Sequence, residues 1–137
     1  MSRILWLLML ITLPAQADMV VIMKSDCGVE QLSRQDVINI YMGRYRSLSN
    51  GSSAVPMDID GSSPEKEYFY NHLLDKTLPE INAYWARLIF SGKIAPPEIV
   101  PTQSEALKRI SRDCKAIAYV DRLNLNDRVK VVYEFKP

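Results

Sequence analysis

Histidine, cysteine and excess charge of either sign are scarce in this 137-residue sequence. One histidine, His72, and two cysteines supply too few ligands for a metal centre of the usual His and Cys type. The 17 basic residues nearly balance the 16 acidic ones, which argues against nucleic-acid binding because that requires a basic surface. No nucleophile-elbow, phosphate-loop or zinc-binding motif is present. We therefore expect neither an enzyme nor a bound cofactor.

Long apolar runs are also missing, except at the N-terminus. Arg3 precedes the apolar residues 4–13, and Pro14 and the small-x-small triplet 15–17 follow them. This is the pattern of a secretory signal peptide cleaved after Ala17. The run has ten residues, whereas a membrane span needs about 20. We predict that 1–17 is a signal peptide and that 18–137 is one periplasmic domain with no membrane span.

The two cysteines, Cys27 and Cys114, belong to a chain predicted to be exported. Exported proteins enter an oxidising environment, in which an even number of cysteines favours a disulfide. An unstrained bridge closing so long a loop stabilises a protein by about 2–4 kcal/mol. The alternative is two half-buried thiols.

Hydrophobic periodicity and helix caps predict the secondary structure. Continuous apolar runs or alternation predict strands at 19–23, 55–59, 116–120 and 129–135, with a weaker one at 99–100. A hydroxyl residue followed three positions later by a carboxylate is typical of a helix start, and four such pairs predict four helices: Ser33 and Asp36, Ser62 and Glu65, Thr77 and Glu80, and Thr102 and Glu105. Gly43 and Gly92 are expected to end the first and third helices.

The third of these helices carries a single apolar stripe, which we expect to be buried in the core: Ile81, Tyr84, Trp85, Leu88 and Ile89. The alternation of strands and helices along the chain predicts an α/β domain. It should contain one mostly parallel sheet of four to five strands with helices on both faces.

The segment 55–69 is the most informative stretch for function. An apolar strand runs into a Gly-Ser turn, which runs into an amphipathic helix. This layout directs backbone N–H groups and the positive end of the helix dipole to one place, where proteins hold small anions. We predict a ligand-binding site at the turn and at the end of a neighbouring strand: Ser25, Asp58, Gly61, Ser62 and Ser63. For Ser25 the alternative is an ordinary turn serine.

Three segments together, LSRQDVINIYMGRYRSL, SAVPMDIDGSSPEKEYFYNHLL and CKAIAYVD, resemble one lobe of the phosphate-binding proteins of bacterial ABC transporters. The resemblance covers about 32–135 and implies the type II periplasmic-binding fold, in which two α/β lobes close on an oxyanion. This chain has the length of one lobe. In the family's second lobe an arginine at the end of the strand precedes a Ser-Gly-Thr turn; here the arginine position is Asp58 and the turn is 62–64.

That replacement bears on affinity. An arginine clamps an oxyanion with two charge-assisted hydrogen bonds, whereas a carboxylate at about 4 Å repels it by about 4 kcal/mol at an effective dielectric constant of about 20. The resemblance therefore implies an exported solute-binding-like domain that binds a small, phosphate-like oxyanion at most weakly. The alternative is an envelope interaction or scaffold protein, with another chain or a second copy covering the face left by the missing lobe.

Overall fold

The computed structural model describes residue 11 and residues 18–92 and 94–135. The predicted signal peptide therefore lies, except for one residue, outside the described residues.

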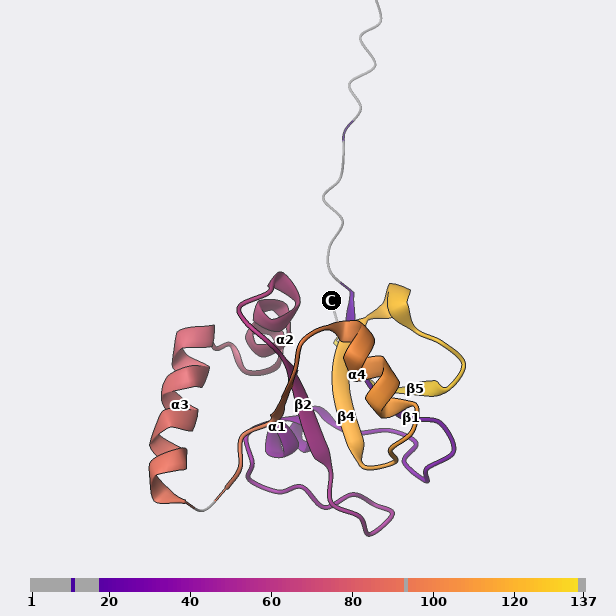
Figure 1. Cartoon of the computed structure of the whole chain (residues 1–137), viewed down its shortest axis with the longest axis horizontal. Helices are drawn as coiled ribbons and strands as arrows, with labels where there is room; N and C mark the ends of the chain where they lie inside the picture. Colours follow the sequence, from indigo (N-terminus) through magenta and orange to yellow (C-terminus); the bar gives the residue numbers. More distant parts are fainter. Residues whose placement is uncertain (1–10, 12–17, 93, 136–137) are drawn as a thin grey trace, which may run out of the picture.

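A five-stranded sheet in the order β3-β2-β4-β1-β5 forms the centre of the described chain (Figure 1). Strand β2 pairs in parallel with β3 and β4, whereas β1 pairs antiparallel with both β4 and β5. Four strands thus run in one direction and β1 runs in the other, which confirms the mostly parallel sheet. The strands are β1 (Met19–Lys24), β2 (Val55–Ile59), β3 (Glu98–Val100), β4 (Ala116–Asp121) and β5 (Val129–Glu134).

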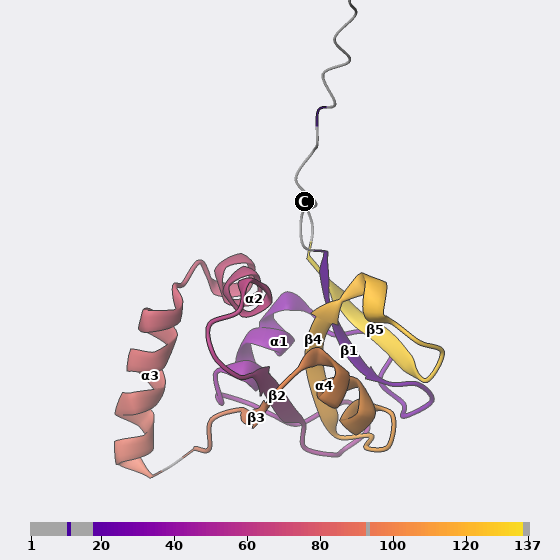
Figure 2. The ribbon, with the colours of Figure 1, turned by 45° about the horizontal axis from the view of Figure 1, so that its top comes forward.

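Helices cover both faces of this sheet, as predicted. Helix α4 packs on one face against β4 and its neighbours, and α1 and α2 pack on the other (Figure 2). Alternate residues of β1 and β4 therefore enter two separate cores, since successive strand residues point to opposite faces. The helices are α1 (Arg34–Tyr41), α2 (Pro64–Leu74), α3 (Leu78–Ser91) and α4 (Gln103–Ile110), with a short 3₁₀ turn, η1 (Arg122–Asn124).

The predicted helix starts are confirmed for α1, α3 and α4, which Ser33, Thr77 and Thr102 cap. The capping pair predicted at Ser62 is wrong. The hydroxyl of Ser63 instead accepts from the N–H of Lys66, and Pro64 is the first helical residue. Proline suits that position because its φ is already helical and its missing N–H needs no partner there. The cap therefore falls on the residue before the proline.

Glycines end two helices as predicted. Gly92 caps α3 with φ 67°, and Gly43 follows the last turn of α1 with φ 71°. Gly43 also leaves no room for a side chain, because a Cβ there would lie 2.5 Å from Ile94 and 2.9 Å from Trp85. The close approach of α3 to the end of α1 therefore needs glycine at this position.

The apolar stripe of α3 is buried only in its first half. Ile81 and Trp85 are buried, but Ile89 is 56% exposed, so the prediction that it belongs to the core is wrong. Phe90 beside it is 94% exposed. The reason is that α3 lies at the margin of the domain, and its C-terminal half extends past the elements that cover its start (Figures 1 and 2).

The predicted disulfide between Cys27 and Cys114 is present and spans 87 residues of sequence. It joins the loop after β1 to the segment that leads into β4. Because β1 and β4 are antiparallel, the end of β1 and the start of β4 lie at the same end of the sheet. The bridge therefore lies at the end of the sheet opposite the turn that follows β2.

Candidate functional site at the end of β2

The Gly-Ser turn lies between the end of β2 and the start of α2, as the sequence predicts. The Asp60 N–H donates to the carbonyl oxygen of Val100 (2.9 Å), which holds the start of the turn against β3. The Asp60 carboxylate accepts from the N–H of Gly61 (2.9 Å). Gly61 has φ 77°, in the left-handed region that favours glycine. The turn thus reverses the chain tightly and starts α2 at the carboxyl ends of β2 and β3.

Two backbone donors are free at this turn. Within the described part of the chain, the N–H groups of Ser62 and Ser63 donate to no protein acceptor. Ser62 is exposed and Ser63 is half-buried. They lie where the positive end of the α2 dipole emerges, a position that favours an anion. The charges nearby oppose it, since Asp60, Glu65 and Glu67 carry the same sign as such a ligand.

Asp58 is the fourth residue of β2, shortly before the turn, and only 5% of its surface is exposed. The hydroxyl of Tyr70 donates to its Oδ2 (2.7 Å), and the hydroxyl of Tyr119 donates to its Oδ1. The ammonium of Lys66 lies 3.6 Å from Oδ2, in an ion pair whose side chains are 11% and 7% exposed. The backbone N–H of Ile59 also donates to Oδ1 (3.1 Å). Both carboxylate oxygens are therefore occupied by donors of the chain itself.

Burial keeps the tyrosines of this cluster protonated. Desolvation raises the pKa of Tyr70 and Tyr119 well above the ordinary value of a tyrosine, and the charge of Asp58 raises it further. The pKa of Tyr41, whose hydroxyl donates to the carbonyl oxygens of Met57 (2.9 Å) and Ile117 (3.3 Å), rises for the same two reasons. All three hydroxyls therefore remain hydrogen-bond donors at neutral pH.

Sequence reasoning missed Lys66, Tyr70 and Tyr119 as partners of Asp58. Two signals could have found them. Lys66 and Tyr70 are four residues apart and therefore share one side of α2. Tyr119 lies within the apolar strand run AIAYV, where its buried hydroxyl needs a partner. The predicted repulsion of an oxyanion by the carboxylate of Asp58 is therefore wrong, because the buried ammonium of Lys66 pairs with that carboxylate.

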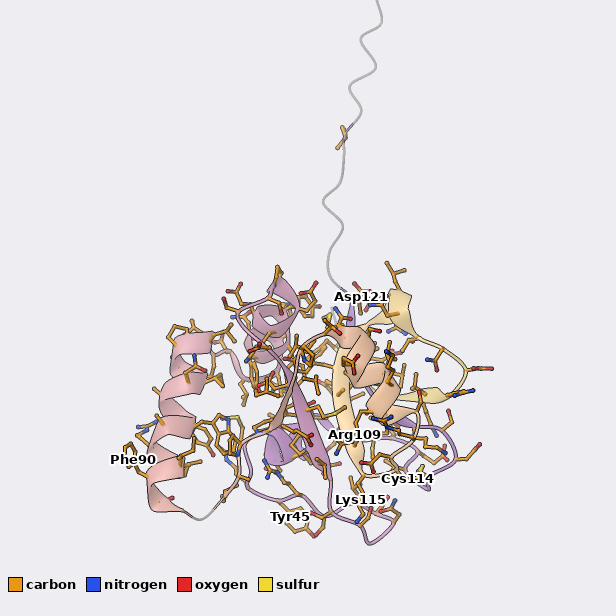
Figure 3. The ribbon with its side chains drawn as sticks, in the orientation of Figure 1. Tyr45, Phe90, Arg109, Cys114, Lys115 and Asp121 are labelled. Carbon is orange, nitrogen blue, oxygen red and sulfur yellow. A yellow bond between two sulfur atoms is a disulfide. The ribbon has the colours of Figure 1, made fainter. Side chains whose placement is uncertain are left out.

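Ser25 does not join the turn. Because β1 is antiparallel to β4, Met19 pairs with Asp121, and the end of β1 lies at the opposite end of the sheet from the end of β2. Figure 3 shows this length of sheet, with Asp121 at one end and Cys114 at the other. The N–H of Ser25 donates to the carbonyl oxygen of Arg128 (3.0 Å). The prediction that Ser25 shares a site with 58–63 is wrong, since it assumed parallel strands.

Other polar side chains that could contribute to a site do not gather with this cluster. Asp60 is exposed while Asp58 is buried, so they form no carboxylate pair. His72 is exposed and stacks on Tyr68. The Arg46 Nε donates to the carbonyl oxygen of Ile40 at the end of α1 (3.1 Å), away from the turn.

The described residues contain neither a metal-binding cluster nor a membrane-spanning helix. The described ranges contain no group of three His, Cys, Asp or Glu side chains placed to hold a metal ion. In the same ranges, no helix combines the length and hydropathy needed to cross a membrane.

Comparison with known proteins gives structural matches only. No family model matches the sequence, and no curated protein matches it significantly. An ABC-type phosphate transport receptor of Vibrio cholerae matches 85% of this chain with a TM-score of 0.67 and 14% identity. A phosphate ABC transporter substrate-binding protein of Clostridium perfringens, solved with bound phosphate, matches 85% of this chain with a TM-score of 0.67 and 15% identity. PstS from Borrelia burgdorferi matches 77% of this chain with a TM-score of 0.58 and 14% identity.

The chain spans less than half of these structures: 45%, 44% and 41% of their respective lengths. At 14–15% identity the likeness shows the fold alone. The described chain therefore has the fold of one lobe of a phosphate-binding protein of this type.

Proposed function

We propose that this protein is an exported, single-lobe, solute-binding-like protein that binds a small oxyanion, phosphate or sulfate, weakly at the turn before α2. The observation that carries the proposal is the pair of free backbone donors at Ser62 and Ser63, placed at the positive end of α2. One of the structural neighbours was solved with phosphate bound. The N-terminal sequence pattern and the disulfide support export, because disulfides persist in oxidising compartments.

Binding is weak because the turn lacks a free cation. Lys66, the first lysine after the turn, is buried against Asp58, while Asp60 and Glu67 are exposed and repel an anion. Two neutral hydrogen bonds contribute about 1 kcal/mol each, and a helix terminus adds up to about 1 kcal/mol when it is exposed. Together these terms reach about 3 kcal/mol, which corresponds to a Kd of roughly 6 mM, and the acidic neighbours weaken it further.

The test is an NMR titration of the ¹⁵N-labelled protein with phosphate and sulfate at constant ionic strength, with chloride as the reference salt. We expect saturable shifts confined to the amides of 61–67. Ser62→Asp, which adds a negative charge beside the free donors, should abolish the shifts. The matched control is Ser49→Asp, in an exposed loop, which should leave them unchanged. Shifts spread over the whole surface, or insensitive to Ser62→Asp, would contradict the proposal.

A second candidate function is protein interaction in the envelope, with another chain or with a second copy. The observation that favours it is the exposed end of α3, where Phe90 and Ile89 are 94% and 56% exposed. Large exposed apolar side chains that adjoin one another mark interaction surfaces. Sedimentation velocity of the wild type and of Phe90→Glu tests the self-association form. A wild type that stays monomeric at about 100 µM would exclude a dimer of biologically useful affinity.

A further inference from the structure

Four donors converge on the buried carboxylate of Asp58 from three elements of the fold. Oδ1 accepts from the Tyr119 hydroxyl of β4 and from the Ile59 N–H of β2. Oδ2 accepts from the Tyr70 hydroxyl of α2 and faces the Lys66 ammonium at 3.6 Å. Each oxygen thus has two partners, and one of the four donors is a cation.

Such a set of donors is what a protein presents to a bound oxyanion: hydroxyls, a backbone N–H and one ammonium around a dry cavity. Here the cavity is closed, since Asp58 and Lys66 are only 5% and 8% exposed. Removing the carboxylate would leave the ammonium buried without a counter-ion, a state that proteins avoid. The donors therefore need an anion between them, whatever its source.

We infer that this cluster is a carboxylate-binding pocket that the chain fills with its own side chain, so that Asp58 acts as an internal ligand. The pocket is distinct from the exposed turn, because none of its four donors is a backbone N–H of Ser62 or Ser63. Once the carboxylate of residue 58 is removed, the pocket takes a small carboxylate from solution, of the size of formate or acetate.

The carboxylate of Asp58 thus adds a polar link among β2, β4 and α2 that needs no bound solute. Aromatic packing also joins α2 to β4, since Phe69 stacks on Tyr119, but the buried polar contacts among β2, β4 and α2 centre on the carboxylate of Asp58 and the tyrosine hydroxyls beside it. The internal anion is always present, so the order of this end of the sheet does not depend on a solute concentration. A solute that binds at the turn before α2 is therefore not needed to hold β2, β4 and α2 together.

Chemical rescue of the purified protein tests the inference. Asp58→Ala removes the carboxylate and leaves a cavity of its size, and thermal unfolding is measured in 100 mM sodium formate, acetate or chloride. We expect formate to raise the Tm of Asp58→Ala over chloride by about 5 °C, in a saturable manner, as for a ligand with a Kd of about 10 mM. Acetate should act less, and neutral formamide should not act.

Matched controls separate this effect from general salt effects. The wild type and Asp60→Ala, which lacks the exposed carboxylate two residues away, should gain no more from formate than from chloride. Equal gains in all three proteins would overturn the inference, as would an Asp58→Ala variant as stable as the wild type.

A double variant decides the case in which Asp58→Ala does not fold in either salt. Asp58→Ala with Lys66→Met removes the cation that requires the anion, so it should fold in chloride and gain nothing from formate. A double variant that is equally unfolded would contradict the inference. Neither outcome bears on the phosphate titration of the outer turn, which uses other donors.

Discussion

Asp58 and Asp60 are two residues apart, yet they have opposite surroundings. Asp58, in β2, is buried and meets two tyrosine hydroxyls, a lysine and a backbone N–H. Asp60, in the turn, is exposed, and within the described ranges its carboxylate accepts only from the N–H of Gly61. The first carboxylate holds the junction of β2, β4 and α2 together, and the second only shapes the turn.

This difference shows that the charge at a position does not by itself determine what that charge does to a ligand. A carboxylate in water keeps most of its charge available to repel an anion, subject to screening. A carboxylate paired with a buried ammonium presents almost no net charge to the outside. An anion at the turn is therefore repelled by the charge of Asp60. Asp58 instead stabilises the contacts among β2, β4 and α2.

Alkaline pH should have the largest effect, because it acts on all the buried tyrosines together. The raised pKa values of Tyr41, Tyr70 and Tyr119 mean that the folded state keeps protons which the unfolded state loses above pH 10. Their stabilisation is complete below pH 10 and is lost as the pH rises further. Three such groups lower the free energy of unfolding by about 4 kcal/mol per pH unit.

The measurement is a tyrosine absorbance titration beside circular dichroism. We expect part of the tyrosine signal to appear only as the protein unfolds. Ionisation of all seven tyrosines in a protein that is still folded would contradict the burial of the cluster.

Lys66→Met should come next, since it removes the cation from a buried ion pair. The free energy of unfolding should fall by about 3–5 kcal/mol, because an unpaired carboxylate remains in the core. Urea unfolding measures the loss. Lys108→Met is the control, as Lys108 forms an ion pair with Glu105 on the exposed face of α4, and its loss should be below about 1 kcal/mol. Equal losses would remove the contrast between buried and exposed charge.

Removing the disulfide should have a smaller effect, and at the other end of the sheet. The double substitution of Cys27 and Cys114 by serine should lower the free energy of unfolding by about 2–4 kcal/mol, mainly by relaxing the unfolded chain. The amide spectrum of 58–66 should stay unchanged, because the bridge lies at the far end of β4. Altered signals in that segment would show that the two ends are coupled.

Asp60→Asn should have the smallest effect and should act on binding alone. The asparagine oxygen can still accept from the N–H of Gly61, so the turn is kept while one repelling charge is lost. We expect phosphate to bind about two- to five-fold more tightly at low salt, with less change at high salt. Asp127→Asn, in an exposed loop, is the control for net charge and should leave the Kd unchanged.

Local patterns in the sequence predicted the elements well. The apolar run before Lys24 and the capping pairs at Ser33 and Thr77 depend on neighbours within a few residues, and the structure confirms them. The predicted cap of α2 is one residue too early. The spacing of Ser62 and Glu65 favours a cap at 62, whereas the preference of proline for the first helical position places the cap at Ser63. The structural comparison shows the single-lobe fold that the resemblance implied.

What depends on distant residues could not be predicted in the same way. The sequence alone determined the α/β class and the strand–turn–helix junction at Gly61, because short-range periodicity specifies them, and its two cysteines allow one possible bridge, which the structure confirms. Only the tertiary structure decided that β1 runs against its neighbours, which separates Ser25 from the turn. It also decided that Asp58 meets Tyr119, 61 residues away. A hydrophobic pattern specifies which side of a strand is buried, but neither the direction of its neighbour nor the partner that neutralises a buried charge.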